Sequence, residues 1–578
     1  MNKQTLKRQI DVAAGRAPAD LRIANCRVVD VYNRSVFDAD VLVADGFVAG
    51  YGGPGFPRAR ETFDAGGAYL APGLIDSHVH IESSHLSPAE FSRLVVPCGT
   101  TTVVADPHEI CNVCGLDGFD YMLRASRDIA LQVFLQVPSC VPSTPFENAG
   151  ATLDAPEIAA RIGLDRVLGL GEMMNYVGVC AADDAILDKL LVAKGCDKVV
   201  DGHCPGLNGA TLDAYAASGV RTDHECTTPA ELVERIRRGI YVMLRQGTAC
   251  HDLLNLLPGV NRGNDRFCLF CTDDRQPADI IREGHIDNMI RLGVDSGLDP
   301  IIALRMATIN VADCYGLRDR GAVAPGRRAD LILFESLEEL WVRDVWIGGR
   351  HVASMGRYLV EDPPVSAHGV SGRMNVRGFS QARLALPLAS NQVRTIRLVP
   401  GSVVTQEGRA TVQRTPQGLW TRDGQDIVKI AVVERHKGTG NVGLGLLEGY
   451  GLRGGAIATS VAHDSHNIIV AGDDDRDMAL AVERLIEIGG GMVIIRDGQV
   501  LGSLMQEIAG LMTDRPSDNV ARRIDMLCKQ AWNELGVHED IDPFMVLCFM
   551  ALPVIPNLKM TDAGLFDVNA FRTVPVEA

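Results

Sequence analysis

The sequence predicts an α/β protein: a (β/α)8 barrel with a flanking β-sandwich domain and a C-terminal α+β domain. Three observations predict this architecture. Residues 71–320 alternate eight times between an apolar strand-like run and a helical pattern, the number of units that closes such a barrel. Short alternating strands lie on either side, in residues 1–70 and 321–360, and are expected to form two parts of one β-sandwich. Residues 361–578 mix strands, glycine and long helical patterns, as a separate domain would.

Each expected barrel strand is an apolar run that leads into a polar turn and then into a helix. In chain order the runs are "GLIDSHVH", "TTVVADPHE", "LQVFLQVPS", "RVLGLGEM", "KVVDGHCPG", "VRTDHECT", "YVMLRQG" and "FCLFCTDD". Helical patterns such as "SPAEFSRLVVPCG" lie between them, and Ser87 is the expected N-cap of that helix. Chain order alone also allows an open, doubly wound sheet of the same elements.

Composition and charge narrow the class of protein. Of the 578 residues, 46% are hydrophobic and 22% charged, which is ordinary for a soluble enzyme. The sequence has no apolar run of about 18 residues and no apolar core of a secretory signal, so a cytoplasmic protein without a membrane span is expected. A net charge of −17 disfavours a nucleic-acid partner. The 15 cysteines are scattered through apolar segments and are expected to behave as small hydrophobic residues.

Ligand-type side chains stand where the expected barrel strands end, at the rim that carries the active site of such barrels. They are His78 and His80 on the first strand, Asp106, His108 and Glu109 on the second, Glu172 on the fourth, His203 on the fifth, His224 and Glu225 on the sixth, and Asp273 and Asp274 on the eighth. Residues i and i+2 of a strand point to the same face, so His78 and His80 can reach one cation. Imidazoles and carboxylates suit Zn, Fe or Mn, and this set therefore predicts a metal site.

These strand ends resemble those of the amidohydrolase superfamily, whose barrel holds one or two divalent metals. Within this superfamily, the sequence motifs are similar to those of the bacterial adenine deaminase group. The resemblance lies in "HVHIESS", "DPHEICNVCG", "GEMMNYVGV", "DGHCPGL", "TDHECTT" and "CTDDR", and in "ATSVAHDSHNIIVAGDD" of the C-terminal domain, which most amidohydrolases lack. It extends over nearly the whole chain. It implies hydrolytic deamination of adenine to hypoxanthine and ammonia, a step of purine salvage, and a homo-oligomer, with a dimer favoured.

The resemblance also implies a ligand set for two divalent cations, Mn²⁺ or Fe²⁺, with Zn²⁺ possible. His78, His80 and Asp273 would bind the first cation, and His203 and His224 the second. Glu172 occupies the position where many relatives use a carboxylated lysine, and a glutamate there would bridge the two cations without added CO₂.

The same resemblance implies catalytic roles. The cations would activate a water that attacks C6 of the purine. Asp273 would accept a proton and deliver it to the departing amine, because one of its oxygen atoms can stay free. Glu172, His108 and Glu109 are further candidates, the last two for protonating the ring or holding another metal. Glu225 and Asp274 would orient the histidines or simply face solvent.

Other short motifs invite different interpretations. In the C-terminal "AHDSHN", His463, Ser465 and His466 are expected on a loop that covers the barrel mouth and contacts the substrate, rather than in a serine-nucleophile triad. Cys111 and Cys114 form a C-x-x-C beside His108 without the spacing of a zinc deaminase. The alternative functions are an amidohydrolase that acts on a different 6-aminopurine or on a cyclic amide, and a barrel whose metals are structural. Glu172 in place of the lysine speaks against a cyclic-amide hydrolase.

Overall fold

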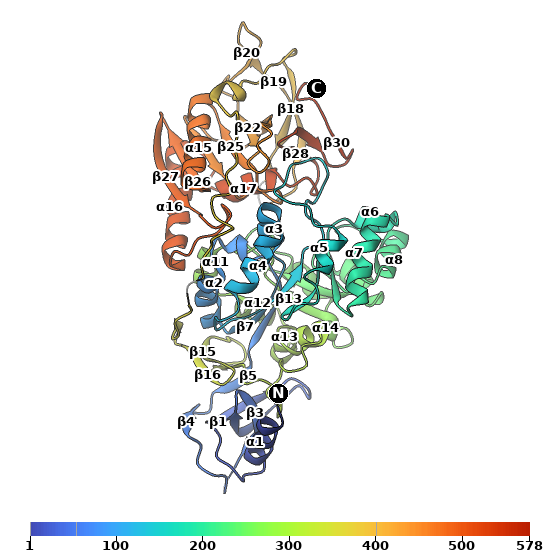
Figure 1. Ribbon diagram of the computed structural model, residues 1–578, viewed down its shortest axis with the longest axis vertical. Helices are drawn as coiled ribbons and strands as arrows, with labels where there is room; N and C mark the ends of the chain where they lie inside the picture. Colours follow the sequence, from blue (N-terminus) through green and yellow to red (C-terminus); the bar gives the residue numbers. More distant parts are fainter. Residues whose placement is uncertain (1, 54, 364, 400–401) are drawn as a thin grey trace.

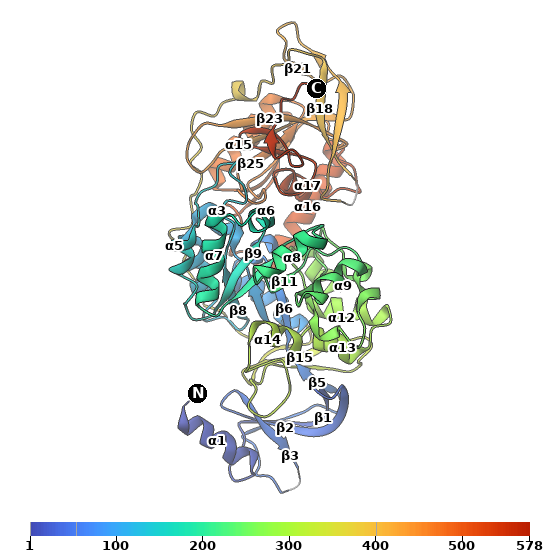
Figure 2. The same cartoon turned by 90° about the vertical axis from the view of Figure 1, so that its right-hand side faces the viewer.

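The computed structural model describes residues 2–53, 55–363, 365–399 and 402–578. Its three parts follow one another along the long axis (Figure 1): an N-terminal sheet, a central barrel, and a C-terminal domain over the opposite end of the barrel. The view turned by 90° shows the same order (Figure 2). Among the described residues, no helix is both long and apolar enough to cross a lipid bilayer.

The central part is a barrel of eight parallel strands, as predicted. They are β6 (Leu74–Val79), β7 (Thr100–Ala105), β8 (Gln132–Val137), β9 (Val167–Met173), β10 (Val199–Gly202), β11 (Thr222–Asp223), β12 (Tyr241–Arg245) and β13 (Cys268–Cys271). Continuous pairing joins β6 to β10 and β11 to β13. The Arg221 N–H donates to the Val200 carbonyl (2.8 Å) between β10 and β11, and the Asp273 N–H donates to the His78 carbonyl (3.1 Å) between β13 and β6. These two contacts close the ring, and the open-sheet alternative is therefore wrong.

Helices surround the barrel and complete the repeating units (Figure 1). They are α2 (Pro88–Val95), α3 (His108–Cys114), α4 (Leu116–Ala125), α5 (Ala155–Ala159), α6 (Tyr176–Cys180), α7 (Asp184–Gly195), α8 (Gly209–Ala217), α9 (Pro229–Arg237), α10 (Leu253–Leu256), α11 (Pro277–Glu283), α12 (Ile286–Asp295), α13 (Pro300–Met306) and α14 (Ile309–Tyr315). Ser87 is the N-cap of α2, but its hydroxyl makes no capping hydrogen bond. Its N–H instead donates to the Thr513 carbonyl of the C-terminal domain (3.0 Å).

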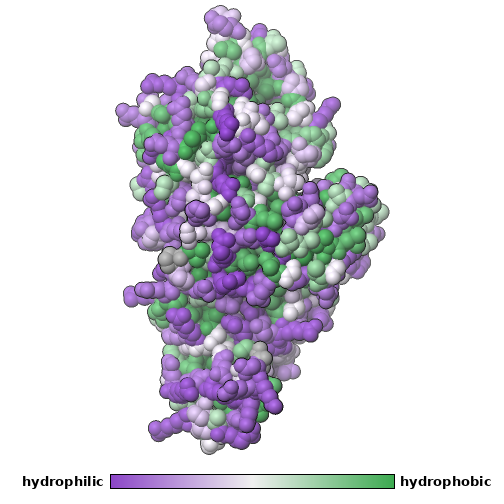
Figure 3. Space-filling view, viewed as in Figure 1, coloured by the Kyte–Doolittle hydropathy of each residue, from purple (hydrophilic) through white to green (hydrophobic). Residues whose placement is uncertain are grey.

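The outer surface of the barrel carries an apolar patch. Figure 3 shows hydrophobic side chains gathered on the lobe that carries α6, α7 and α8. Val177 of α6 is 66% exposed and Leu191 of α7 is 61% exposed. Exposed apolar side chains that gather into one patch are typical of contact surfaces between proteins.

The N-terminal sheet takes strands from both sides of the barrel region, as the sequence predicts. Its strands are β1 (Leu21–Asp30), β2 (Ser35–Ala44), β3 (Phe47–Gly52), β4 (Glu61–Asp64), β5 (Tyr69–Pro72), β14 (Leu331–Phe334), β15 (Val342–Ile347), β16 (Arg350–Ser354) and β17 (Arg357–Tyr358). β5 pairs with β14 in an antiparallel arrangement and joins the two halves. Ile23 and Trp346, from opposite halves, are buried in one apolar cluster. Helix α1 (Lys3–Ala13), which the sequence did not predict, packs on β3.

The C-terminal domain combines an eight-stranded sheet with three helices. The strands, in sheet order, are β19 (Gln406–Thr411), β18 (Gln392–Arg397), β23 (Val442–Glu448), β22 (Ile427–Val433), β25 (Ile468–Gly472), β24 (Ala456–Thr459), β26 (Gly491–Arg496) and β27 (Gln499–Met505). The helices are α15 (Asp475–Ile488), α16 (Ser517–Leu535) and α17 (Pro543–Met550), and a small sheet holds β28 (Leu558–Thr561), β29 (Gly564–Asp567) and β30 (Arg572–Thr573). The loop between β24 and β25 reaches the carboxyl ends of the barrel strands, because His463 and His466 contact Glu109 there.

Candidate metal centre

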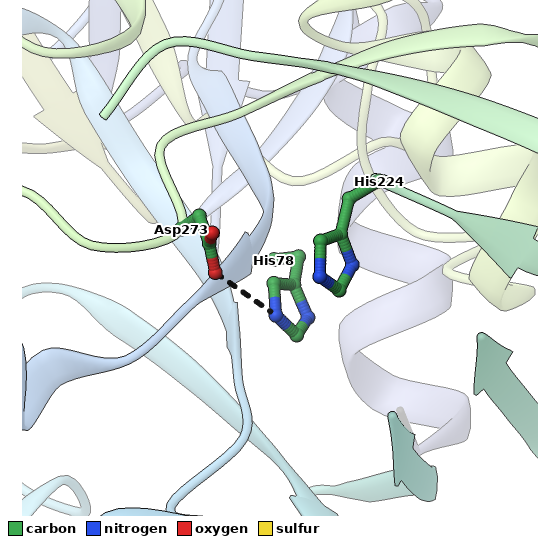
Figure 4. Close-up of side chains that lie close together, drawn as sticks. All are labelled: His78, His224 and Asp273. Carbon is green, nitrogen blue, oxygen red and sulfur yellow. Dashed lines mark ion pairs between the residues drawn. The ribbon is translucent and has the colours of Figure 1, made fainter. Parts of the chain in front are cut away.

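The ligand-type residues predicted from the strand ends converge at one rim of the barrel. All are buried except His203, Glu225 and Asp274, which are half-buried. Figure 4 shows His78, His224 and Asp273, with the His78 and Asp273 side chains paired. The rings of His78 and His224 are stacked, with centroids 4.4 Å apart. Three strands far apart in the sequence therefore place their functional groups within contact distance of one another.

The first group of ligand atoms surrounds one point between β6 and β13. His78 Nε2 lies 3.2 Å from His80 Nε2. Asp273 Oδ1 lies 3.2 Å from His80 Nε2 and 3.5 Å from His78 Nε2. His80 Nδ1 is 2.9 Å from the Asp106 carbonyl, an acceptor, so Nδ1 carries the proton and Nε2 presents a lone pair. A lone pair that faces a second imidazole nitrogen and a carboxylate is the arrangement expected around a cation.

The second group lies on the other side of Glu172. Glu172 Oε2 is 2.8 Å from His203 Nδ1 and 3.4 Å from His224 Nε2. Its other oxygen, Oε1, is 3.2 Å from His80 Nε2 of the first group. The two oxygens of one carboxylate are thus divided between two sets of imidazoles, the geometry that a bridging ligand requires. Several triads of these residues bring their ligand atoms within 4.8 Å of one another.

The donor atoms suit one or two divalent transition-metal ions, which explains their arrangement better than a network of ion pairs alone. Burial alone would raise the pKa of Glu172, but hydrogen bonds from His108, His203 and His224 keep it well below its usual range. The side chain is therefore a carboxylate, the form that binds metal. Nitrogen and carboxylate donors suit Zn, Fe and Mn, whereas Ca and Mg prefer oxygen ligands.

Asp273 has no free oxygen in this arrangement. Oδ1 faces the two histidines, and Oδ2 accepts a hydrogen bond from Arg245 Nη1 (3.1 Å). The expected free oxygen is thus held by a guanidinium. Asp273 also adopts a left-handed backbone conformation (φ 58°), which turns its side chain back toward β6 as the chain leaves β13.

Arg245 is a residue of the site that the sequence analysis missed. It ends β12, the seventh barrel strand, and its buried guanidinium also contacts Glu225 and Asp252. Glu225 Oε1 in turn lies 3.4 Å from His224 Nε2, so Glu225 is a neighbour of the predicted ligand histidines rather than a solvent-facing carboxylate. A charged residue after the apolar "YVML" was the available signal.

The second barrel strand contributes support for Glu172. Asp106 Oδ2 accepts a hydrogen bond from the Glu172 backbone N–H (2.9 Å). His108 Nδ1 is 3.3 Å from Glu172 Oε1, and its Nε2 is 3.4 Å from Glu109 Oε1. Asp106 and His108 are therefore next to the predicted bridging ligand, while Glu109 is one step further away.

Glu109 joins the barrel to the loop between β24 and β25. His463 Nδ1 lies 2.5 Å from Glu109 Oε1, and His466 Nε2 contacts Glu109 Oε2. His466 Nδ1 accepts a hydrogen bond from the Ala462 N–H (3.0 Å), so the proton of the neutral ring is on Nε2 and is donated to Glu109. Burial lowers the pKa of His466 to about 4, consistent with a neutral ring. This nitrogen is a hydrogen-bond donor and has no lone pair for a metal.

A cavity of about 540 Å³, partly open to solvent, lies over the ligand atoms. His463 lines it, together with Asp464 of the same loop, which was not among the predicted substrate-binding residues. Ser465 and His466 are not among its lining residues. Cys111 and Cys114 are buried in α3, and burial raises the pKa of Cys114 to about 11. A thiol in that state is a poor metal ligand, since metals bind the thiolate.

Comparison with known proteins gives the chain's relatives. Residues 69–352 match the amidohydrolase family, and residues 402–572 match the adenine deaminase C-terminal domain. The chain is 51% identical over 582 residues to adenine deaminase 2 of Desulfotalea psychrophila, with 100% of both chains covered. It is 53% identical to adenine deaminase of Nitratidesulfovibrio vulgaris (strain DP4), with 98% of each chain covered, and 48% identical to adenine deaminase 2 of Carboxydothermus hydrogenoformans, with 99% of each covered.

Proposed function

The chain belongs to the adenine deaminases of the amidohydrolase family, and on that premise we propose how its residues carry out the hydrolysis of adenine to hypoxanthine and ammonia. The observation that carries the proposal is the division of the two Glu172 oxygens between His80 on one side and His203 with His224 on the other. A carboxylate placed in this way supports a pair of cations that share one water.

Six side chains would hold the cations. His78, His80 and Asp273 would bind one, His203 and His224 the other, and Glu172 would contact both. When bound, divalent cations supply an activated water, because they lower the pKa of water that they contact. The nitrogen and carboxylate donors suit Mn²⁺, Fe²⁺ and Zn²⁺, and we propose Mn²⁺ or Fe²⁺ on the resemblance to the family.

Residues of the chain would move the protons. Hydrolysis breaks the bond between C6 and the exocyclic nitrogen, and ammonia leaves only if that nitrogen gains protons. Asp273 would accept a proton from the attacking water and return it to the departing amine. Because Oδ1 faces the ligand atoms of His78 and His80, Oδ2 would carry that proton, and Arg245 would give up its hydrogen bond to Oδ2 in that step. His108, which lies beside Glu172, would protonate the purine ring. Glu109 contacts the other nitrogen of the His108 ring and orients it.

The C-terminal domain would shield the reacting groups from bulk solvent. His463 and Asp464 close one side of the cavity, and Glu109 anchors their loop through His463 and His466. We propose that the protein acts in the cytoplasm and in purine salvage, as the resemblance to the family implies. We propose a dimer, which the exposed Val177 and Leu191 support as a contact surface.

The test is an assay of ammonia release from adenine. The protein is stripped with a chelator, reloaded with Mn²⁺, Fe²⁺ or Zn²⁺, and assayed in parallel with another 6-aminopurine and with a hydantoin. We expect turnover of adenine that is lost on stripping and returns with about two equivalents of metal per chain. Turnover of the hydantoin instead of adenine would make the protein a cyclic-amide hydrolase. Undiminished adenine turnover after complete stripping would refute the metal mechanism.

A further inference from the structure

The cavity over the metal centre has two chemically different halves. The barrel lines it mostly with polar side chains, His80, His108, Glu172, His203, His224, Glu225, Arg245, Asp273 and Asp274, and also with Met174 and Cys250. The other half is largely apolar and comes mainly from the segment around the end of α17. Phe549, Leu552, Val554 and Ile555 lie there, with Val403 beside them. A substrate in the cavity therefore meets charged groups on one side and a hydrocarbon surface on the other.

Four of these side chains follow one another within seven residues of sequence. Phe549 and Leu552 are buried, whereas Val403, Val554 and Ile555 are only half-buried. The Phe549 ring also packs on His463, with the centroids 5.0 Å apart, so the apolar surface continues into the loop between β24 and β25. Half-buried apolar residues that line a cavity beside a reactive centre expose apolar surface, and a bound ligand can cover it.

We propose that Phe549, Leu552, Val554, Ile555 and Val403, here called the apolar wall, bind the flat face of the purine ring and hold its C6 edge toward the metal centre. This inference rests on the proposed function, because it names the part of the same site that recognises the substrate. A purine has two apolar faces and a polar edge, so the two halves of the cavity match its chemistry. Aromatic and aliphatic surfaces recognise bases through their faces.

A buried lysine fixes the position of the apolar wall. Lys559 of β28 is fully buried, and its Nζ donates hydrogen bonds to the carbonyl oxygens of Val403 (2.9 Å) and Phe549 (3.0 Å). These two wall residues lie far apart in the sequence and are tied together through one side chain. Burial lowers the pKa of Lys559 to about 7, and keeping an amine in this apolar position is explained if its hydrogen bonds must hold the two wall segments in register. Lys559 is thus a positioning residue for the wall.

The apolar wall is tested by truncating Phe549 and measuring how well the ring is bound. The metal-loaded Phe549→Ala protein is compared with Phe571→Ala, a control in which an exposed phenylalanine of the same domain, away from the cavity, is truncated in the same way. The KM for adenine is measured, together with the Kd of purine, which has the ring but lacks the amine. We expect both constants to rise at least about fivefold in Phe549→Ala, the low end for loss of one contact between a base and an aromatic ring. The control should stay within twofold.

Further variants keep the test decisive. If Phe549→Ala does not fold, Ile555→Ala on the half-buried side of the wall is measured instead, with the same expected direction. Lys559→Met should weaken purine binding without changing metal content. Unchanged KM and Kd in the folded wall variants would overturn the proposal while leaving the deaminase assignment intact. Purine binding is measured without turnover, so failure of the unaltered protein to release ammonia from adenine would instead count against the proposed function alone.

Discussion

The barrel rim and the C-terminal domain cover opposite sides of one cavity and are built in different ways. At the rim, each functional group follows an apolar strand, so its position is set by the hydrogen-bonded ring of strands beneath it. On the other side, His463 and Phe549 come from a loop and a helix end, and their positions depend on how two domains dock. The rim supplies charge and cation ligands, whereas the C-terminal domain supplies shape and apolar surface. We conclude that changes at the rim should remove the chemistry, and that changes in the C-terminal domain should alter binding or stability.

The largest effect is expected at Glu172, which contacts both groups of ligand atoms. Glu172→Ala should lose one equivalent of metal and lower kcat by more than the roughly 10–100-fold typical of residues that only support a ligand. Metal content by mass spectrometry and kcat for adenine are measured on the same samples. Glu483→Ala, an exposed glutamate on α15, is the control and should keep both. Retention of two metals and of activity in Glu172→Ala would show that this carboxylate does not bridge.

A smaller loss is expected at Arg245, which holds Asp273 and Glu225 without binding a cation. Arg245→Met leaves both buried carboxylates without their guanidinium, and kcat should fall about 10–100-fold while the metal content is preserved. Arg245→Lys should have a kcat close to that of Arg245→Met, because one ammonium cannot reproduce the forked contacts of the guanidinium. Arg237→Met, at an exposed position on α9, is the control. Loss of metal in Arg245→Met would place this residue among those needed for cation binding, contrary to this expectation.

These two positions also show what can be predicted from sequence. The eight strands were predicted correctly as a barrel, and the ligand-type residues after them do lie together at one rim, because apolar runs and the residues after them are local features. Arg245 was missed, since a single arginine after a strand has no distinguishing pattern. Phe549 and Lys559 could not be found either. Their roles arise from contacts between segments more than 100 residues apart, such as Lys559 with Val403.

Where the barrel meets the loop between β24 and β25, Glu109 should affect stability and binding more than chemistry. Glu109→Gln replaces one acceptor oxygen by an N–H donor, which cannot accept from both His463 and His466. The free energy of unfolding should fall by about 1–3 kcal/mol, the usual cost of leaving a buried polar group unsatisfied, and the KM for adenine should rise severalfold. A double-mutant cycle with His466→Ala measures the coupling. Strictly additive effects in that cycle would mean that the two side chains do not interact energetically.

The smallest effect concerns Glu147, which supports the same loop from the barrel side. Burial, with the neighbouring Asp464 carboxylate, raises the pKa of Glu147 from 4.5 to about 8. The folded state therefore binds more protons than the unfolded state between those two pH values, and the stability contributed by protonated Glu147 is complete below pH 4.5 and lost as the pH rises through 8. Glu147→Gln stays neutral, so its stability relative to the unaltered protein should improve from pH 7 to pH 8.5 by roughly 1 kcal/mol. Denaturant unfolding across that range measures this gain. Glu539→Gln, at an exposed position, should show none. A gain that is the same at every pH would mean that Glu147 is already ionised in the folded protein, and that its environment is more polar than its burial implies.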